Sequence, residues 1–393
     1  MKIAFTNPNY WPYIRRGAER YIHDMAGFLA QRGHQVHVIT STPGQPHTVE
    51  QDGVKILYLR QVRHPLLNNL RMIRHDFFGW TAYPLLRSGG YDVIDTMTYF
   101  CALAALRARR YSGTPFQFRV LMVPLCGGRF WDPPAVSTAV ARADRTVAFS
   151  RWSAEWIEHT YHVPCNVLYS IVDLNRFRPG ARRDLTVPRI LFASDLRDPK
   201  KGGGLLFMAF EQVHRLCPQA VLELAGPGGD QPGNLLELLS PSARHRVVPL
   251  GAGAHVDIAQ LYPQAAVTVL PTLQEPFGMV LAESLACGTP VVGTRQGGAS
   301  EIVGNAPVGR LIDLRDWHEI LSPRAANHLA MAIMEAIDLA ADPETARLCR
   351  QRASRFSLDV LGPELEESYS QLVRQGTSTV RSQRSASAVV HQR

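Results

Sequence analysis

Short apolar runs alternate along the chain with longer stretches in which apolar residues recur every three or four positions. Lys2–Thr6 has the pattern of a buried strand, and Gln35–Thr40 is a second β-rich run. Between them, a helix is expected, because apolar residues recur at helical spacing and Gly33 follows as a stop signal. These residues are Ala18, Tyr21, Ile22, Met25 and Leu29. Further strands are expected at Lys55–Leu59, Val93–Asp95, Phe116–Val120, Thr146–Phe149 and Asn166–Tyr169. This alternation predicts a parallel sheet with helices on both faces.

The alternation of strand and helix patterns is interrupted at 171–188. This stretch contains Pro179, Gly180 and Pro188 and is typical of a linker. The alternation then starts again, with strands expected at Arg189–Ala193, Val221–Ala225, Val247–Leu250, Ala266–Leu270 and Pro290–Gly293, and helices at Leu205–Leu216, Val256–Tyr262 and Val280–Ala286. We therefore expect an α/β protein of two doubly wound, Rossmann-like domains, 1–180 and 181–375, that face a central cleft. Ligands of such sheets bind at the carboxyl ends of the strands. Residues 376–393 are rich in Ser, Arg and Gln, which predicts a disordered basic tail.

Composition excludes several classes of protein. Hydrophobic residues make up 46% of the 393 residues, enough for sizeable cores, and no apolar run approaches the roughly 20 residues of a membrane-spanning helix. Residues 1–6 have the pattern of a strand, with no basic region followed by an apolar stretch, so we expect no secretory signal. The six cysteines are scattered, which argues against a zinc site or a disulfide framework. No nucleic-acid-binding signature is present. These features favour a cytoplasmic protein.

The charge is unevenly divided. Residues 1–185 contain 23 Lys+Arg and 13 Asp+Glu, whereas residues 186–393 contain 19 and 21, so the net charges are +10 and −2. An anionic partner for the first half is one interpretation. The other is an arginine-rich composition, because 38 of the 42 basic residues are Arg.

The segment Glu275-Pro-Phe-Gly-Met-Val-Leu-Ala-Glu283 is the most specific in the chain. It follows an expected strand and opens an expected helix, with Pro276 suited to a first helical turn. Gly278 has no side chain, so a ligand can approach the backbone N–H groups there. Glu275 and Glu283 are eight residues apart, and two carboxylates suit a ligand with many hydroxyl groups. Two glutamates alone would more often be a helix-terminus residue and a solvated one.

The succeeding residues, Cys287-Gly-Thr-Pro-Val-Val-Gly293 and Gly297-Gly298, complete a pattern that resembles glycosyltransferase family 4, the retaining GT-B enzymes. That family has two glutamates in E-P-F-G-x-x-x-x-E, followed by G-x-P-V-V and a glycine pair. The resemblance implies a GT-B architecture. It also implies that Glu283 binds the ribose of a sugar nucleotide. Glu275 and the backbone of the intervening residues would hold the donor sugar and the diphosphate: Phe277, Gly278, Met279 and Val280.

A second candidate site lies in Ser194-Asp-Leu-Arg197-Asp-Pro-Lys-Lys201-Gly202, between an expected strand and helix. Cations there can neutralise a leaving diphosphate. The chain has only four lysines, and Lys200 and Lys201 are adjacent. Lys201-Gly202 resembles the family's phosphate-binding Lys-Gly. The family usually has Gly-Arg-Leu before it, and Arg197 comes one residue late in a gapless match, so its equivalence is open.

Gly17, at the start of the first helix, is a third candidate for a phosphate contact, although a plain loop glycine fits equally well. The family has two glycines here, and the first is Arg16 in this chain. Two further departures are Leu121, where the family often has a His, and Ser170-Ile171 in place of Asn-Gly. These departures concern the donor or acceptor contacts and leave the fold unaffected.

The function expected from the resemblance is retaining transfer of a sugar from a nucleoside-diphosphate sugar to an acceptor hydroxyl, with Glu275, Lys201 and Arg197 as catalytic candidates and without a metal or other cofactor. A sugar-nucleotide epimerase on the same fold and a catalytically weak GT-B partner protein are the alternatives. The acceptor is expected to be anionic or lipid-linked, or else small and soluble. Residues 64–87 mix Leu, Ile, Phe and Trp with Arg, which allows a peripheral contact at the inner membrane face as well as ordinary packing on the sheet.

Overall fold

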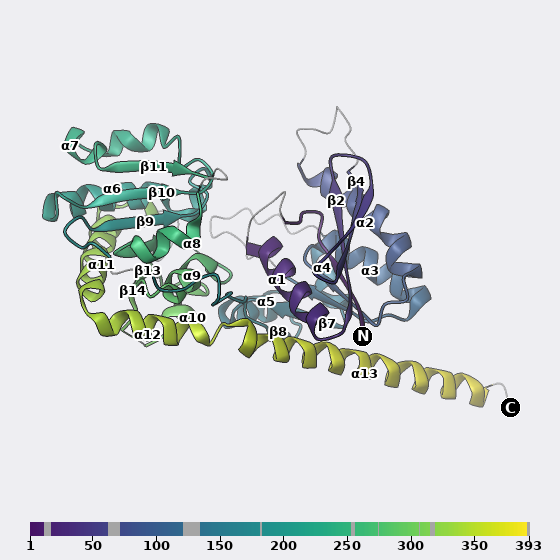
Figure 1. Ribbon diagram of the computed structural model, residues 1–393. Helices are drawn as coiled ribbons and strands as arrows, with labels where there is room; N and C mark the ends of the chain where they lie inside the picture. The colour runs from purple at the N-terminus through teal and green to yellow at the C-terminus, as the bar shows by residue number, and fades with distance from the viewer. Residues whose placement is uncertain are drawn as a thin grey trace.

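The computed structural model describes the chain except for residues 12–16, 62–70, 121–133, 181–182, 253–255, 274, 306, 315–318 and 391–393, and except for the side chains at 71–76, 320 and 377–390. Two sheets, each flanked by helices, form two α/β domains that lie side by side (Figure 1). Arg16 and Leu121, at which the sequence departs from the family pattern, lie outside the described residues.

The N-terminal domain contains a sheet in the order β3-β4-β2-β1-β5-β6-β7-β8. All neighbouring strands are parallel except β3 and β4. The strands are β1 Lys2–Thr6, β2 Gln35–Thr42, β3 His47–Gln51, β4 Val54–Arg60, β5 Val93–Thr96, β6 Phe116–Arg119, β7 Arg145–Ala148 and β8 Cys165–Val167. The helices are α1 Gly17–Gln31, α2 Arg71–Ser88, α3 Tyr99–Ser112, α4 Pro134–Arg142 and α5 Arg151–Tyr161.

The C-terminal domain contains a fully parallel sheet in the order β11-β10-β9-β12-β13-β14. Its strands are β9 Arg189–Ala193, β10 Val221–Ala225, β11 Val247–Gly251, β12 Val267–Leu270, β13 Val291–Thr294 and β14 Gly309–Ile312. Its α-helices are α6 Gly203–Leu216, α7 Pro241–Arg244, α8 Ile258–Leu261, α9 Met279–Ala286, α10 Ala299–Val303, α11 Pro323–Ala341 and α12 Pro343–Ser354. Short 3₁₀ turns are η2 Pro199–Lys201, η3 Gly233–Leu238, η4 Tyr262–Gln264 and η5 Glu319–Leu321.

These sheets confirm the expected pair of doubly wound domains. The strands β1, β9 and β12 have buried central residues, which explains why the sequence shows them as apolar runs. Strand β3 was not expected, because all five of its residues are exposed and the segment has no apolar alternation. It pairs antiparallel with β4 at the edge of the sheet, where a polar strand is tolerated.

The chain passes between the domains twice. Val172 forms a parallel bridge with Ser357, and its N–H donates to the Phe356 carbonyl at 2.8 Å. After this crossing, helix α13, Leu358–Val390, returns to the N-terminal domain and packs against α1 (Figure 1). The helix extends through most of 376–393. Side chains beyond Gly376 lie outside the description, and the predicted disorder of this tail stays a prediction.

A fully buried polar cluster joins α13 to the N-terminal sheet. One carboxylate oxygen of Asp95, Oδ2, accepts from Tyr369 Oη at 2.6 Å, from Gln117 Nε2 at 2.7 Å and from Arg119 Nε at 3.2 Å. Asp95 and Arg119 side chains are both 0% exposed. The Arg119 guanidinium also lies 4.6 Å from the centre of the Tyr21 ring. The Tyr369 hydroxyl therefore attaches α13 to a charge pair that is buried inside the N-terminal domain.

Helix α2 covers only part of the surface predicted from residues 64–87, since 62–70 are not described. On the described part, Trp80 is 63% exposed and stacks under Arg107 at 4.6 Å, while Phe78 is buried. The helix therefore has one face in the core and an exposed aromatic residue on another.

Candidate functional site

The loop before helix α9 is held by backbone contacts to the glycine pair. Glu275 forms a parallel bridge with Gly297, and its carbonyl accepts from the Gly298 N–H at 2.8 Å. A Cβ at Gly297 would come within 2.4 Å of the Glu275 carbonyl oxygen, and one at Gly298 equally close to that of Phe277. Only glycine allows this approach, which explains the glycine pair that follows β13.

Helix α9 begins directly after Gly278, whose φ of 101° belongs to the left-handed region that favours glycine. The backbone N–H groups of the first turn, at Met279 and Val280, follow this residue. The Phe277 side chain points elsewhere: it is buried, 5.3 Å from the Phe356 ring and 6.2 Å from the Tyr169 ring. Its contribution to a ligand can therefore come only from the backbone, as the resemblance implied.

Two of the predicted catalytic side chains lie in direct contact. Lys201 Nζ donates to Glu275 Oε2 at 2.6 Å, although the two residues are 74 positions apart. Burial by itself would lower the pKa of Lys201, but the Glu275 carboxylate raises it above the ordinary value. The lysine therefore stays charged, as a stabiliser of a developing anion must.

The lysine loop is positioned by the end of strand β12. Thr272 Oγ1 donates to the Lys200 carbonyl at 2.7 Å. Gly202 has a φ of 75°, and a Cβ there would lie 2.0 Å from the Pro271 carbonyl oxygen. The packing of η2 beside the end of β12 thus requires glycine at 202, and this packing directs Lys201 toward Glu275.

Arg197 is placed differently. Its guanidinium forms two 2.9 Å hydrogen bonds with the Asp195 carboxylate, and its side chain is 66% exposed. Its stem packs against Gly228, where a Cβ would be 2.5 Å from Arg197 Cγ. The described contacts therefore unite Lys201 with Glu275 and leave Arg197 in a neighbouring pair on the same loop.

Glu283 is the other glutamate of the motif and is buried on α9. Tyr262 Oη donates to its Oε2 at 2.9 Å, and Arg20 Nη1 lies 3.4 Å from its Oε1. Burial raises the pKa of Glu283, and the Arg20 charge opposes that rise. Arg20 belongs to α1, so this contact joins the two domains.

Gly17, the first residue of α1, lies opposite α9. A Cβ at this glycine would be 3.3 Å from Met279 Cγ. Gly17 therefore lies next to the Glu275–Glu283 segment, across the interface between the domains. Sequence reasoning missed Arg20 and Tyr262, although Arg20 follows Gly17 by three residues on the same helix.

A second cross-domain contact lies near the site. The Glu301 carboxylate on α10 accepts from the backbone N–H groups of Arg151 and Trp152, both at 3.0 Å, and from Tyr169 Oη at 2.8 Å. A carboxylate at the start of α5 satisfies N–H groups that have no partner within the helix. The domains therefore meet through specific polar contacts.

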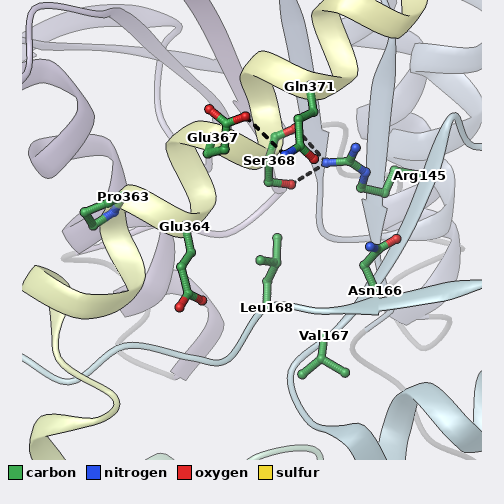
Figure 2. A pocket seen from close by; sticks show the side chains of 9 residues that line it. All are labelled: Arg145, Asn166, Val167, Leu168, Pro363, Glu364, Glu367, Ser368 and Gln371. Atoms are coloured by element: carbon green, nitrogen blue, oxygen red, sulfur yellow. Dashed lines mark hydrogen bonds between the residues drawn. The ribbon is translucent and has the colours of Figure 1, made fainter.

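A groove of about 490 Å³ lies away from these residues, between β7, β8 and α13 (Figure 2). Arg145 projects across it and donates through Nη1 to the Ser368 carbonyl at 2.6 Å and to Ser368 Oγ. The groove follows from how α13 is attached to the edge of the N-terminal sheet, and it contains none of the predicted site residues.

The residues that the structure describes contain no group of three or more His, Cys, Asp or Glu side chains arranged to hold a metal ion. Among the described residues, no helix is long and apolar enough to cross a membrane. Independence of metal stays a prediction.

Comparison of the fold with solved structures gives close matches over nearly the whole chain. Sucrose-phosphate synthase from Thermosynechococcus elongatus has a TM-score of 0.79 at 21% identity, covering 95% of this chain and 99% of that one. Anabaena HepE in complex with UDP-glucose has a TM-score of 0.69 at 21% identity, covering 94% and 100%. Starch Synthase IV from Arabidopsis thaliana, bound to ADP and acarbose, has a TM-score of 0.70 at 12% identity, covering 95% and 99%. The fold is that of the GT-B glycosyltransferases.

Sequence comparison agrees in both domains. The family profile described as "Glycosyltransferase Family 4" matches residues 15–176, and the profile "Glycosyl transferases group 1" matches 187–337. A D-inositol 3-phosphate glycosyltransferase of Saccharomonospora viridis is 29% identical, covering 87% of this chain and 86% of that protein. A glycogen synthase of Mycobacterium tuberculosis H37Rv is 25% identical, covering 90% of each. The chain belongs to glycosyltransferase family 4.

Proposed function

We propose that this glycosyltransferase moves a sugar from a nucleoside-diphosphate sugar to an acceptor hydroxyl with retention of configuration at the anomeric carbon. The observation that carries the proposal is the 2.6 Å pair of Lys201 and Glu275 beside the start of α9. The pair places a cation for a leaving diphosphate next to a carboxylate that can accept hydrogen bonds from sugar hydroxyls. The structural relatives named above include complexes with UDP-glucose and ADP, which supports a nucleotide donor.

The proposed reaction takes place on one face of the sugar. The bond between the anomeric carbon and the diphosphate oxygen breaks, and the acceptor oxygen bonds to the same carbon from the same side. The acceptor proton passes to the departing phosphate oxygen, so the products are the glycoside and the nucleoside diphosphate. Lys201 stabilises the charge that develops on the diphosphate, and Glu275 holds the donor sugar.

The test is an assay of nucleoside diphosphate release, with a panel of sugar nucleotides chosen first by the rise in melting temperature that each causes. Retaining transfer predicts that release depends on an added acceptor. It also predicts that the sugar in the product, examined by NMR, has the same anomeric configuration as in the donor. Conversion of the sugar nucleotide without an acceptor would instead indicate an epimerase. Binding without either reaction would indicate a non-catalytic partner. Activity that a chelator abolishes and Mg²⁺ restores would contradict the metal-independent mechanism.

We further propose that the acceptor is anionic, because residues 1–185 carry the net +10 and in this family the N-terminal domain is expected to hold the acceptor. Exposed charges are screened beyond about 8 Å at physiological salt. Acceptor KM should therefore rise between 20 mM and 300 mM NaCl, while donor KM changes less. Equal acceptor KM at both salt concentrations, together with no sedimentation on anionic vesicles, would favour a neutral soluble acceptor.

A further inference from the structure

Arg20 is a residue of the N-terminal domain that reaches a predicted donor-binding carboxylate of the C-terminal domain. It lies in the first turn of α1, and its Nη1 is 3.4 Å from Glu283 Oε1. The two residues are 263 positions apart in the chain. The start of α1 also touches the start of α9, since Gly17 packs against the Met279 side chain. The Arg20 contact thus lies beside a contact between the first residues of these two helices.

Arg20 is held in this position by aromatic packing. Its guanidinium lies 5.2 Å from the centre of the Trp11 ring and 5.3 Å from that of Phe177, and its side chain is only 13% exposed. Cation–π stacking of this kind stabilises the packed position of the guanidinium relative to a solvent-exposed one. Trp11 follows β1 in the sequence, and Phe177 follows the crossing between the domains.

The other oxygen of Glu283 is fixed by its own domain. Tyr262 Oη donates to Oε2 at 2.9 Å, and the Tyr262 ring meets Phe177 edge-on at 5.9 Å. Each carboxylate oxygen therefore has one partner: a phenol on the C-terminal side and a guanidinium on the N-terminal side. The carboxylate plane is set by the two together.

We propose that Arg20 is a positioning residue for the donor: it orients the Glu283 carboxylate and favours its charged form, so that both carboxylate oxygens are placed for the ribose hydroxyls when α1 lies against α9. This inference rests on the proposed function, in which Glu283 binds the ribose. An ionised carboxylate accepts through both oxygens, whereas a protonated one uses one of them as a donor. Arg20 acts through Glu283 and has no part in the chemical step.

The charge balance around Glu283 gives the proposal a pH signature. Burial raises the pKa of this carboxyl and Arg20 lowers it, so removal of Arg20 would move the pKa further up. The titratable and charged groups that face Glu283 come from α1, the crossing segment, η4 and the end of α9: Arg20, Asp24, Arg176, Tyr262 and Cys287. Among these, Arg20 is the cation in contact with the carboxylate.

The first test measures the dissociation constants of UDP and ADP by calorimetry for the wild type, Arg20→Met and Arg20→Lys. One of the two nucleotides will bind the wild type more tightly. For that nucleotide, we expect Arg20→Met to raise the dissociation constant about ten- to hundredfold, the scale of one charged hydrogen bond. Because fewer Glu283 groups are ionised at low pH in this variant, the loss should be larger at pH 5.5 than at pH 8. Arg20→Lys should recover part of the affinity. In turnover, donor KM should rise while kcat at saturating donor stays within about twofold.

The matched control is Arg107→Met, because Arg107 also stacks on an aromatic ring, that of Trp80, but lies on α3. It should bind nucleotide like the wild type. In the Glu283→Gln background, which has no titrating carboxyl, Arg20→Met should add little further loss and no pH dependence. Equal losses in both backgrounds, or an unchanged dissociation constant in a folded Arg20→Met protein, would overturn the proposal.

A second test needs no nucleotide and separates this inference from the proposed function. Glu283 has a raised pKa in the folded protein and a higher one still without Arg20, so the native state of Arg20→Met binds more protons and its stability falls as pH rises. The melting temperature of Arg20→Met should therefore be furthest below the wild type at pH 8 and approach it near pH 5. A gap that does not vary with pH would contradict the pairing. Absence of UDP and ADP binding in the wild type would count against the proposed function, while the melting data still decide the pairing.

Discussion

Lys201 and Arg197 lie on the same loop, yet their surroundings differ in what they can do for an anion. Lys201 is in contact with Glu275, and Arg197 is committed to Asp195 at the surface. We expect Lys201→Ala to lower kcat by roughly 100-fold or more, the scale of losing one preorganised charge stabiliser. Arg197→Ala should lower kcat much less, because its guanidinium is paired with Asp195 at the surface and not with Glu275. Steady-state rates of product release measure both.

Lys55→Ala serves as the control for this pair, since Lys55 is another of the four lysines and lies exposed on β4. Its rate should equal that of the wild type. Near-normal turnover in Lys201→Ala together with an inactive Arg197→Ala would show that the arginine, despite its late position in the motif, is the cation that matters.

At this scale the sequence predicts the residues but not their partners. Glu275, Gly278 and Lys201 were identifiable because each stands in a short pattern with a local backbone requirement. The Arg20–Glu283 contact joins positions in different domains, and neither residue has a neighbour in sequence that indicates the other. Contacts of this kind depend on how the domains dock, which local periodicity does not encode.

The turn between β9 and α6 shows how one glycine can position a functional loop. At Gly202 the φ of 75° is combined with a Cβ position 2.0 Å from the Pro271 carbonyl oxygen. Gly202→Ala must therefore move η2 away from β12 and carry Lys201 with it. We expect loss of stability well above the roughly 1–2 kcal/mol of a left-handed alanine, together with a large loss of kcat. Urea denaturation and the release assay measure the two effects.

Gly33 offers a matched comparison, because its φ is 85° but nothing lies within 4 Å of its Cβ position. Gly33→Ala should cost only the backbone strain and leave kcat unchanged. If both variants lose the same stability and keep full activity, the packing of the lysine loop on β12 does not determine the site.

Elements with one strongly buried face or with complete burial were predictable, and exposed or short ones were not. Strand β9 was expected at its observed bounds, since its central residues are completely buried. Strand β3 has five exposed residues, and its pairing is imposed by β4. Helix α13 is a second case: its last part lies in the Ser-, Arg- and Gln-rich segment for which the sequence predicts disorder, and its attachment to Arg145 and Asp95 is a long-range property.

In the whole molecule, α13 attaches the C-terminal part of the chain to the N-terminal domain. Tyr369→Phe removes the hydroxyl that donates to Asp95 Oδ2 at 2.6 Å inside a fully buried cluster. We expect a loss of about 1.5–3 kcal/mol in unfolding free energy, as for a hydrogen bond to a charged group, with kinetic constants unchanged. Tyr111→Phe, at a 66% exposed ring, should leave the urea midpoint unaltered. The prediction is wrong if the two variants have the same midpoint.

The position of Tyr369 also has a consequence for how the protein is made. Arg119 and Asp95 emerge from the ribosome long before their phenol partner, which is synthesised roughly 250 residues later than Arg119. At about 5–20 residues per second, that interval lasts on the order of 10–50 s. During this time the growing N-terminal domain has its buried ion pair and the site for α13 but no helix to cover it. Docking of α13 on this sheet must therefore wait until the C-terminal part of the chain has been made, and a protein-binding chaperone has that interval in which to act.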